Sequence, residues 1–531
     1  MITDGIPIVL TASAAEMSQY YDKKTGFPSE FKAFTCTFPY KLTNMLRKFQ
    51  VPDRDFDGSA RFAPFGLRVV ESALVAKYGR DSVVVCHPYD LDKFVGPDTK
   101  MVGVSTMDPA GLGYVSITYN SIIGFGGKAL DAKCFEELME NPAIKKFGST
   151  IVVGGQGAWQ IEDAGLQKKL GVDILVKGQG LESIGKIAGD ILGDNKVQQI
   201  YETEKPDYNK IPHILKAACY GAVEITRGCG RGCQFCSPTA QHGYVHSFSL
   251  EDIMANVETN VNGGSKMIFT TGEDTFLYGA ENLGKGFIPN REAITKLYSS
   301  IANYPGVEYI HLSHASIAPI LHDKKILKEL TPILMDKSGR HLNKKPYVTV
   351  EVGVESGSTR IMNIYNKGKA KPFNVDNWPS LVREGLGEMN DNTWYPLITI
   401  ITGWPKETED DNIKTLELVE SLKPYKTFIV PNLFIPLEEA LLSDERRKDL
   451  HELSETQWDI IASAWKHNIS VWADQAEYKN YSIIARAAAL ALIPFIKNKH
   501  GNKAIRPVMK FAGITLGKHI SPEKCDSKLC K

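Results

Sequence analysis

Three cysteines close together form the strongest chemical signal in this chain of 531 residues. Cys229, Cys233 and Cys236 lie in the stretch RGCGRGCQFC, and the other cysteines are scattered. Three thiolates are one too few for a closed zinc site, which takes four ligands. They suit a four-iron cluster whose fourth iron stays open to another molecule. A zinc ion completed by a distant histidine, or a coincidental group of reduced cysteines, is the alternative.

Glycine-rich and acidic segments follow the cysteines, each after an apolar run. These segments are TTGED (270–274), GVESGSTRIM (353–362) and ITGWPKETEDD (401–411). Taken singly, each has a plain structural interpretation: Glu273 is a loop acid or a helix cap, and Glu355 is a carboxylate at a strand end. Their order after the cysteine motif is what makes them a series.

The stretch AVEITRGCGRGCQFCS resembles the signature of the radical S-adenosylmethionine (SAM) enzymes. In that family three cysteines hold a [4Fe-4S] cluster, and the open iron binds the amino and carboxylate groups of SAM. One-electron reduction cleaves SAM to a 5′-deoxyadenosyl radical, which takes hydrogen from the substrate. The resemblance covers residues 220–436 and implies an external one-electron reductant.

The resemblance also implies contacts with SAM. Glu273 occupies the position that binds the amino group, while Gly403 and Phe235 would lie near the adenine. The segment that reaches the ribose and the carboxylate supplies Glu355, Ser356 and Arg360.

Apolar β-type runs alternate with helical segments before the cysteines. Such alternation predicts a parallel sheet with helices on both faces, and ligands bound beyond the carboxyl ends of the strands. We expect strands at 6–10, 82–88, 101–108, 150–155 and 172–178. The strand ends are rich in glycine, which would let the backbone approach a large ligand.

The order of elements in 66–185 resembles the cobalamin-binding domain that precedes one branch of the radical SAM family. The last loop reads Gly-Gln-Gly-Leu-Glu instead of the usual Gly-Glu-Gly-Glu. The resemblance implies these cobalamin contacts: Ser105, Thr106, Met107, Gly154, Gly155, Gln156, Gly157, Gly178, Gln179 and Gly180. A dinucleotide-binding or an empty structural domain is the alternative, but G-x-G-x-x-G is absent after the first strand. Asp-x-His-x-x-Gly is absent too, so we expect no histidine on the lower face of cobalt.

These elements predict an α/β protein in four parts. A Rossmann-like cobalamin-binding domain occupies 1–190, a linker 191–220, a radical SAM core 221–436, and a helical C-terminal domain 437–531 with a role in substrate recognition. The core is a partial or complete (β/α) barrel. Its strands are expected at 222–226, 266–274, 307–313, 347–356, 396–403 and 426–434.

The leading functional hypothesis is a cobalamin-dependent radical SAM C-methyltransferase. By family resemblance, the radical strips hydrogen from an unactivated carbon, and methylcobalamin delivers the methyl group. The acceptor is a protein, a peptide or a small molecule, and the archaeal enzymes that modify methyl-coenzyme M reductase are one resembling type. A methylthiotransferase with a second cluster on Cys36, Cys86 and Cys134 is the first alternative. A rearrangement or oxidation enzyme and a non-enzymatic electron carrier or sensor are the others.

Composition limits the remaining classes. Lys and Arg number 62, as do Asp and Glu, so we expect neither nucleic acid nor a membrane as a partner. The start has no pattern of a secretory signal, and we expect a cytoplasmic protein. The apolar stretch 482–496 is too short to span a membrane and predicts a buried helix. Cys525 and Cys530 are expected to be exposed thiols.

Overall fold

The computed structural model describes residues 4–21, 26–123, 127–281, 286–342 and 344–472, and a few isolated positions after residue 493. The chain divides into two compact units. Unit 1 comprises Met1–Gly228, His246–Gly272 and Lys296–His311, and unit 2 comprises Cys229–Val245, Glu273–Thr295 and Leu312–Lys531. Three segments of the predicted core, 221–228, 246–272 and 296–311, therefore belong to the same unit as the predicted N-terminal domain.

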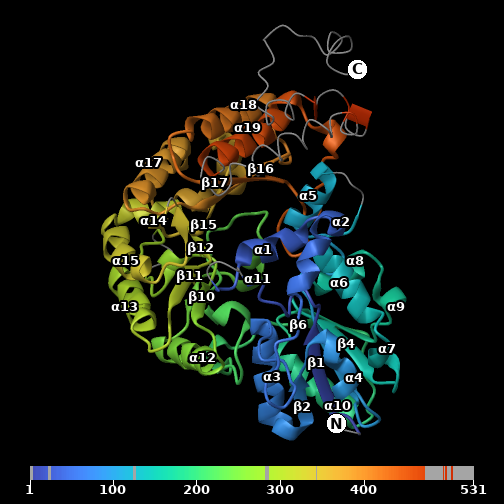
Figure 1. The fold of residues 1–531 in the computed structure, drawn as a ribbon. Helices are drawn as coiled ribbons and strands as arrows, with labels where there is room; N and C mark the ends of the chain where they lie inside the picture. The colour runs from blue at the N-terminus through green and yellow to red at the C-terminus, as the bar shows by residue number, and fades with distance from the viewer. Residues whose placement is uncertain are drawn as a thin grey trace. The chain divides into compact units, whose positions relative to one another are not determined.

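Unit 1 contains a six-stranded sheet with the order β2-β1-β3-β4-β5-β6, and every pair in it is parallel (Figure 1). Its strands are β1 (Ile8–Ala12), β2 (Val83–Val85), β3 (Met101–Ser105), β4 (Thr150–Gly154), β5 (Ile174–Gly178) and β6 (Ile200–Thr203). The first five coincide with predicted strands. Successive side chains point to opposite faces, so Ile8 and Leu10 enter one core and Val9 enters the other.

Helices cover both faces of this sheet. Helices α3 (Phe65–Tyr78) and α10 (Leu181–Leu192) contribute to the first core, and α4 (Leu91–Phe94), α6 (Leu130–Met139) and α8 (Ala158–Asp163) to the second. The order β2-β1-β3-β4-β5 is that of flavodoxin-type sheets. In such sheets the winding reverses between β1 and β3, and ligands bind beyond the carboxyl ends of these two strands.

Strand β6 lies inside the segment 191–220, which the sequence predicts to be a linker. It pairs with β5 through Leu175↔Ile200 and Val176↔Tyr201. As the edge strand of the sheet it is only partly buried, so its sequence IYET lacks the apolar run of a central strand. The linker prediction is therefore wrong for Ile200–Thr203.

The six predicted core strands lie in two further sheets, together with one short strand that was not predicted. One has the order β11-β10-β7, from β7 (Ala222–Glu224), β10 (Met267–Thr271) and β11 (Tyr309–Leu312). The other has the order β12-β15-β16-β17, from β12 (His314–Ala315), β15 (Glu351–Glu355), β16 (Leu397–Thr402) and β17 (Phe428–Leu433). Ser313 alone separates β11 from β12, so the chain passes directly from one sheet to the next.

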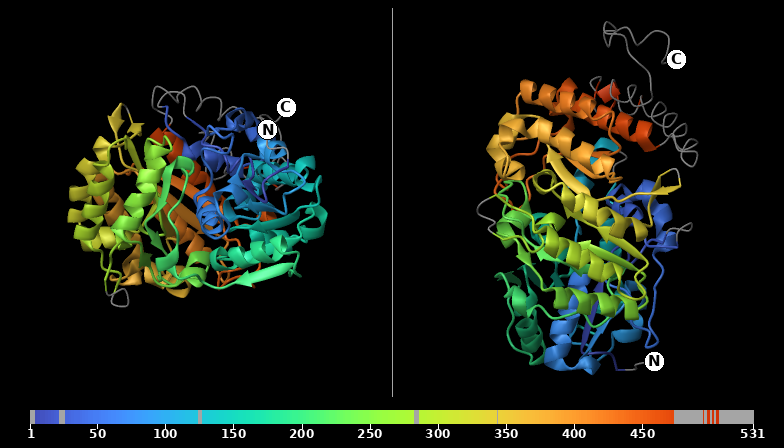
Figure 2. Two further views of the ribbon diagram at one scale, coloured as in Figure 1. Left: turned by 90° about the horizontal axis from the view of Figure 1, so that it is seen from below. Right: turned by 90° about the vertical axis from the view of Figure 1, so that its left-hand side faces the viewer.

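Helices of unit 2 pack in pairs (Figure 2). Helix α14 (Ile317–His322) packs against α17 (Trp378–Asp391), and α18 (Glu409–Ser421) against α19 (Glu455–Trp472). The Asn468 amide on α19 bonds the backbone N and O of Ile429, each at 2.7 Å, and so ties this helix to β17. The C-terminal region is thus helical over α19. Most of the stretch 482–496, together with Cys525 and Cys530, lies outside the described residues.

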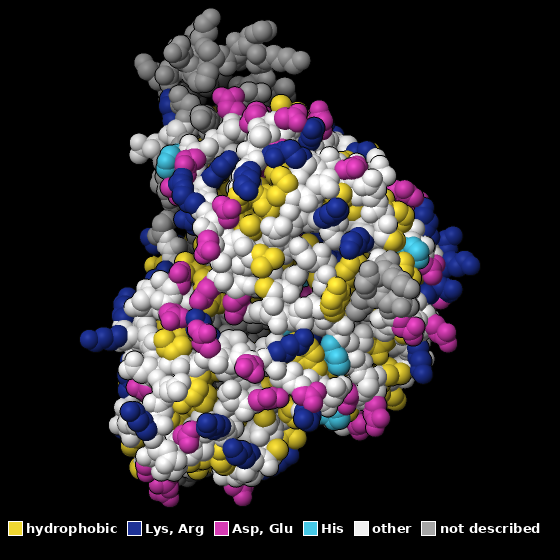
Figure 3. Space-filling model, turned by 180° about the vertical axis from the view of Figure 1, so that it is seen from behind, with side chains coloured by type: hydrophobic (Ala, Val, Ile, Leu, Met, Phe, Trp, Pro, Cys, Tyr) yellow, Lys and Arg dark blue, Asp and Glu magenta, His cyan; other side chains and the backbone are white. Residues whose placement is uncertain are grey.

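Within the described segments, no helix combines the length and apolar character needed to cross a membrane. On the face shown in Figure 3, Lys and Arg side chains alternate with Asp and Glu side chains over the described surface. This mixture agrees with the balanced composition.

Candidate functional site

The cysteine motif forms a tight loop whose thiols face inward. Cys229 and Cys233 are buried, Cys236 is partly buried, and all three are free thiols. Gly228, Gly230 and Gly232 have φ of 80°, 69° and 75°, which an L side chain rarely adopts, so the motif needs glycine at these positions. Gln234 anchors the loop, since its backbone N donates to Tyr365 O at 2.9 Å and its Nε2 to Ile364 O at 2.9 Å.

The spacing of the thiols fits a cluster better than a single zinc ion. Their Sγ atoms do not all lie within 4.8 Å of one another. Thiolates on one tetrahedral zinc, with Zn–S of about 2.3 Å, would lie about 3.8 Å apart. Burial raises the pKa of all three thiols, to about 11 for Cys236. These thiols would therefore lose their protons on binding a metal group.

Two of the predicted SAM contacts lie beside these cysteines. Burial is the main cause of the raised pKa of each thiol. The negative charge of Glu273 raises the pKa of Cys229 further, and that of Glu355 raises the pKa of Cys233 and Cys236 further. Glu355 ends β15, is buried, and has φ of 67°. A non-glycine residue holds this conformation only where its surroundings impose it, and such residues cluster at functional sites.

Two buried cations near the loop were not predicted from the sequence. Lys369 donates to Glu355 Oε1 at 2.7 Å, and Arg231 donates to Asp274 Oδ2 at 3.0 Å. In the sequence alone, Arg231 is one of the residues between the first two cysteines of the motif and has no evident role. Asp274 has the plain interpretation of a helix cap. Asp274 does cap the turn Thr275–Leu277, because its Oδ1 accepts from Phe276 N at 3.1 Å. The sequence held no signal for either pairing, because the partners lie 14 and 43 residues apart in the chain.

An aromatic group lies on the side of the loop where adenine is predicted. Phe235 meets Trp404 edge to face, with ring centroids 5.4 Å apart, and Trp404 stacks on Tyr365 at 5.4 Å. Gly403, which follows β16, has φ of 86°, and its N donates to Glu407 Oε2 at 2.8 Å. Glu407 also accepts from Gln457 Nε2 at 2.6 Å. Sequence reasoning did not single out Glu407.

We predict that Glu407→Gln changes how stability depends on pH. Burial raises the pKa of Glu407 from 4.5 to about 7, although the bonds from Gly403 and Gln457 oppose this. Between pH 4.5 and 7 the folded protein holds a proton that the unfolded chain releases, so this group makes stability fall as pH rises. Glutamine does not titrate, so the variant lacks this loss of stability. Its free energy of unfolding, relative to that of wild type, should therefore rise from pH 4.5 to pH 7. Denaturant titrations at several pH values measure this. A difference in free energy between the two proteins that does not change with pH would contradict the prediction.

Ser356 and Arg360 both make internal contacts. Ser356 Oγ lies 3.0 Å from Thr415 Oγ1. Arg360 donates to Lys406 O at 2.6 Å and also to Asp411 Oδ2, which belongs to the capping box that starts α18. The segment 408–411 is therefore a helix start, its plain structural interpretation. The roles of both residues toward SAM stay predictions.

The predicted cobalamin contacts lie at one edge of the sheet of unit 1, beyond β3, β4 and β5. Met107 is exposed, as are Gly155, Gln156 and Gly178, so this edge is open to a ligand. Thr106 is buried, and its Oγ1 has no hydrogen-bond partner among the described residues. An open edge at the reversal point with an unpaired buried hydroxyl fits a large ligand that offers hydrogen bonds.

Glu16 joins the two strands between which the winding reverses. It follows β1, and its Oε1 accepts from Met107 N, which follows β3, at 3.4 Å. Burial raises its pKa to about 8, so it is largely protonated at neutral pH. Its place just after the first strand was the signal that sequence reasoning missed.

Two of the glycines in these loops serve loop packing. A Cβ on Gly157 would lie 2.4 Å from Met107 O, and one on Gly155 would lie 2.6 Å from Thr106 O. The contacts of Gly155 and Gly157 with cobalamin stay predictions. Gln179 is engaged too, since its Oε1 accepts from Arg227 at 3.0 Å.

We predict that Gly157→Ala destabilises the protein by about 1–3 kcal/mol, the usual cost of forcing a group into packed surroundings. Gly154→Ala is the matched control, because its Cβ would meet Val176 at 3.5 Å, an ordinary contact. Denaturant unfolding of the two variants checks this. Equal stability of the two would contradict the packing role of Gly157.

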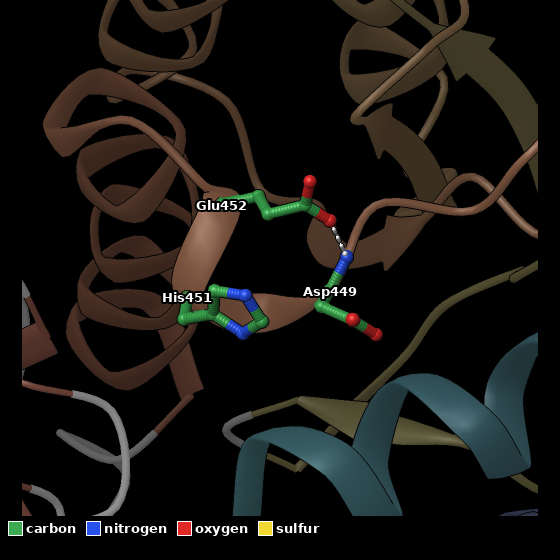
Figure 4. Close-up of side chains that lie close together, drawn as sticks. All are labelled: Asp449, His451 and Glu452. Atoms are coloured by element: carbon green, nitrogen blue, oxygen red, sulfur yellow. Dashed lines mark hydrogen bonds between the residues drawn. The ribbon is translucent and has the colours of Figure 1, made fainter.

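Another group with the chemistry of metal ligands is Asp449, His451 and Glu452 (Figure 4). All three are exposed, and Asp449 and Glu452 form the capping box of the turn Leu450–Glu452. Arg446 pairs with Glu452. The turn accounts for this arrangement, and we assign no cofactor to it.

The segment that contains the cysteine loop, the acid after β10 and the acid that ends β15 matches one family model. The model described as the Radical SAM superfamily matches residues 223–419. This part of the chain is similar to radical SAM domains. The match begins in β7 and ends in α18, so it includes the cysteine loop, Glu273, Glu355 and Gly403.

The curated relatives are methylthiotransferases. The ribosomal protein uS12 methylthiotransferase RimO of Clostridioides difficile is 23% identical over 253 residues, which are 48% of this chain and 52% of the relative. The tRNA-2-methylthio-N(6)-dimethylallyladenosine synthase of Nitratiruptor is 25% identical over 295 residues, which are 55% of this chain and 61% of the relative. The matched part of the chain thus spans about half the length of these relatives.

Solved structures share the fold over more of the chain. TsrM of Kitasatospora setae, a radical SAM methyltransferase solved with cobalamin and a [4Fe-4S] cluster, matches with a TM-score of 0.51 and 13% identity. The match covers 82% of this chain and 74% of TsrM. At this identity the likeness shows the fold.

Proposed function

We propose that this protein is a cobalamin-dependent radical SAM methyltransferase that methylates an unactivated carbon. The observation that carries the proposal is the pairing of two features in one chain. One is a radical SAM domain with three free cysteines in a glycine loop, and the other is a flavodoxin-type sheet with an open carboxyl edge. The proposed methylation of an unactivated carbon needs both a radical and a methyl carrier, and the structural match to TsrM covers 82% of this chain.

The residues divide between the two cofactor sites. Cys229, Cys233 and Cys236 would hold the cluster, and Glu273 would bind the amino group of SAM. The loops after β3, β4 and β5 would hold cobalamin, with the Thr106 hydroxyl as a hydrogen-bond donor. When bound, the cluster supplies an electron for cleavage of SAM, and cobalamin carries the methyl group.

Glu16 affects the charge at the edge of the sheet where cobalamin is proposed to bind. Because burial raises its pKa to about 8, its carboxyl group is largely neutral at pH 7 and places little negative charge at this edge. Cys86, Cys134 and His87 lie near the same sheet. Burial lowers the pKa of His87 to about 4, so its imidazole is neutral at pH 7. We propose, as predicted, that no histidine ligates the lower face of cobalt.

The proposed acceptor is a carbon of a protein or peptide, as in the resembling enzymes that modify methyl-coenzyme M reductase. The two named relatives act on a ribosomal protein and on a tRNA. That nucleic acid is not a partner of this chain stays a prediction from its composition.

A methylthiotransferase is the second candidate, favoured by the curated relatives. It would need a second cluster, for which Cys36, Cys86 and Cys134 were proposed. Cys36 and Cys134 share one core cluster, whereas Cys86 lies in another with Val9 and Val102. This separation argues against one ligand set.

The test uses the reconstituted protein with SAM that carries a trideuteromethyl group, a low-potential reductant and cobalamin. We expect 5′-deoxyadenosine, cobalamin that stays with the protein through gel filtration, and deuterated methylcobalamin. A protein that cleaves SAM but retains no cobalamin would overturn the methyltransferase proposal and favour the second candidate.

A further inference from the structure

Lys369 and Glu355 form a buried ion pair in unit 2, and each of them also has a hydrogen bond to another group of the protein. Lys369 Nζ donates to Glu355 Oε1 at 2.7 Å and to Gly353 O at 3.0 Å. Thr399 Oγ1 donates to the other Glu355 oxygen at 3.1 Å. The Glu355 side chain is 4% exposed and that of Lys369 is 16% exposed. Two charges taken out of water in this way persist only as a hydrogen-bonded pair.

The pair lies beside two of the three cysteines. The turn Lys367–Ala370, which carries Lys369, comes directly after a segment bonded to the cysteine motif, since Tyr365 O accepts from Gln234 N at 2.9 Å. This contact brings the pair to the loop that holds Cys233 and Cys236. In agreement with it, the charges of Lys369 and Glu355 both affect the pKa of these two thiols, which burial raises. Because the surroundings are buried, solvent screens this interaction much less than it would at the surface.

The backbone around the pair is built to hold it. The pairing of β15 with β16 shifts register between Gly353 and Glu355, and Glu355 takes its positive φ there. A Cβ on Gly353 would lie 2.1 Å from Lys369 Nζ and 2.2 Å from Glu355 Oε1, so a side chain at this position would displace the ends of the pair.

The segment that carries Lys369 is pressed against the cysteine loop. It is the turn Lys367–Ala370, whose Gly368 O accepts from Arg231 Nη1 at 3.3 Å. A Cβ on Gly368 would lie 1.8 Å from Arg231 O. The lysine is thus held at a fixed place relative to the loop.

We propose that Lys369 and Glu355 together set the reduction potential of the cluster on the three cysteines, with Lys369 raising it and Glu355 lowering it. The inference rests on the proposed function, because it requires the cluster. Reduction adds one electron from an external low-potential donor and makes the cluster more negative by one charge. A nearby positive charge stabilises that reduced state, and a negative charge destabilises it. Lys369 is in this sense a positioning residue that acts through the cluster.

The experiment compares K369M, E355Q and the double variant with wild type. Iron content is measured first. The midpoint potential then follows from an anaerobic dithionite titration, with the reduced cluster detected by electron paramagnetic resonance. We expect K369M to shift the potential to more negative values, E355Q to shift it to more positive values, and the double variant to return near wild type. K369R should keep the wild-type potential because it keeps the charge.

K371M is the matched control, since Lys371 lies two residues further on but is exposed. Its potential should not change, because solvent screens its charge. Shifts of K369M and E355Q in the same direction, or no shift in chains that retain iron, would overturn the inference. If K369M loses its iron, E355Q decides alone, and an unshifted or lowered potential overturns the inference. A wild-type chain that binds no cluster would instead contradict the proposed function.

Discussion

Replacement of Cys233 by alanine is expected to remove the iron–sulfur cluster. Iron should fall from about four per chain to below about one, and cleavage of SAM should stop, because two cysteines cannot hold a cluster that needs three protein ligands. The described cysteines outside the motif, which are Cys36, Cys86, Cys134 and Cys219, all belong to unit 1. Iron quantitation after anaerobic reconstitution, followed by an assay for 5′-deoxyadenosine, measures both effects.

Cys86→Ala is the matched control for this variant. Cys86 is also a buried free thiol, but it lies in the core of unit 1 with Val9 and Val102. We expect it to keep the iron content of wild type. Retention of about four irons by Cys233→Ala would contradict the assignment of the cluster, and loss of iron by Cys86→Ala would support a second cluster and the methylthiotransferase alternative.

Arg231→Met is expected to be the most destabilising single change near the site, by about 3–5 kcal/mol, because it leaves a buried carboxylate without its cation. The side chains of Arg231 and Asp274 are 3% and 1% exposed. Arg231 also lies over the Phe287 ring at 4.7 Å. Unfolding by denaturant, on protein without cofactors, gives the change in free energy.

The double variant Arg231→Met with Asp274→Asn separates the pair from general packing. It should recover part of the lost stability, since no unpaired charge remains. Lys414→Met, which breaks an exposed pair with Asp410, should leave stability unchanged within error. A double variant no more stable than Arg231→Met would show that the charge is not the cause.

The strands could be predicted because apolar β-type runs mark them directly. Five strands of the first sheet and six of the core lie where those runs predict them. Strand β6 could not be found in this way, because an edge strand with the sequence IYET buries too little to need an apolar run. The division into two units was equally hidden, since it depends on contacts between segments far apart in the chain.

The cysteine motif could be predicted from spacing, but its electrostatic surroundings could not. Lys369 and Glu355 are fourteen residues apart, and Arg231 and Asp274 are forty-three apart. Nothing in the sequence tells which acid a given base will meet. The packing role of two glycines was hidden for a related reason: at positions 155 and 157 the missing side chain makes room for the neighbouring loop.

The most direct test of the central claim is anaerobic purification after expression with supplied cobalamin, followed by quantitation of iron and cobalt. The account predicts about four irons and about one cobalt per chain. About four irons without cobalt would contradict the cobalamin-dependent mechanism and make the first sheet the site of another ligand. About eight irons without cobalt would instead support the methylthiotransferase alternative.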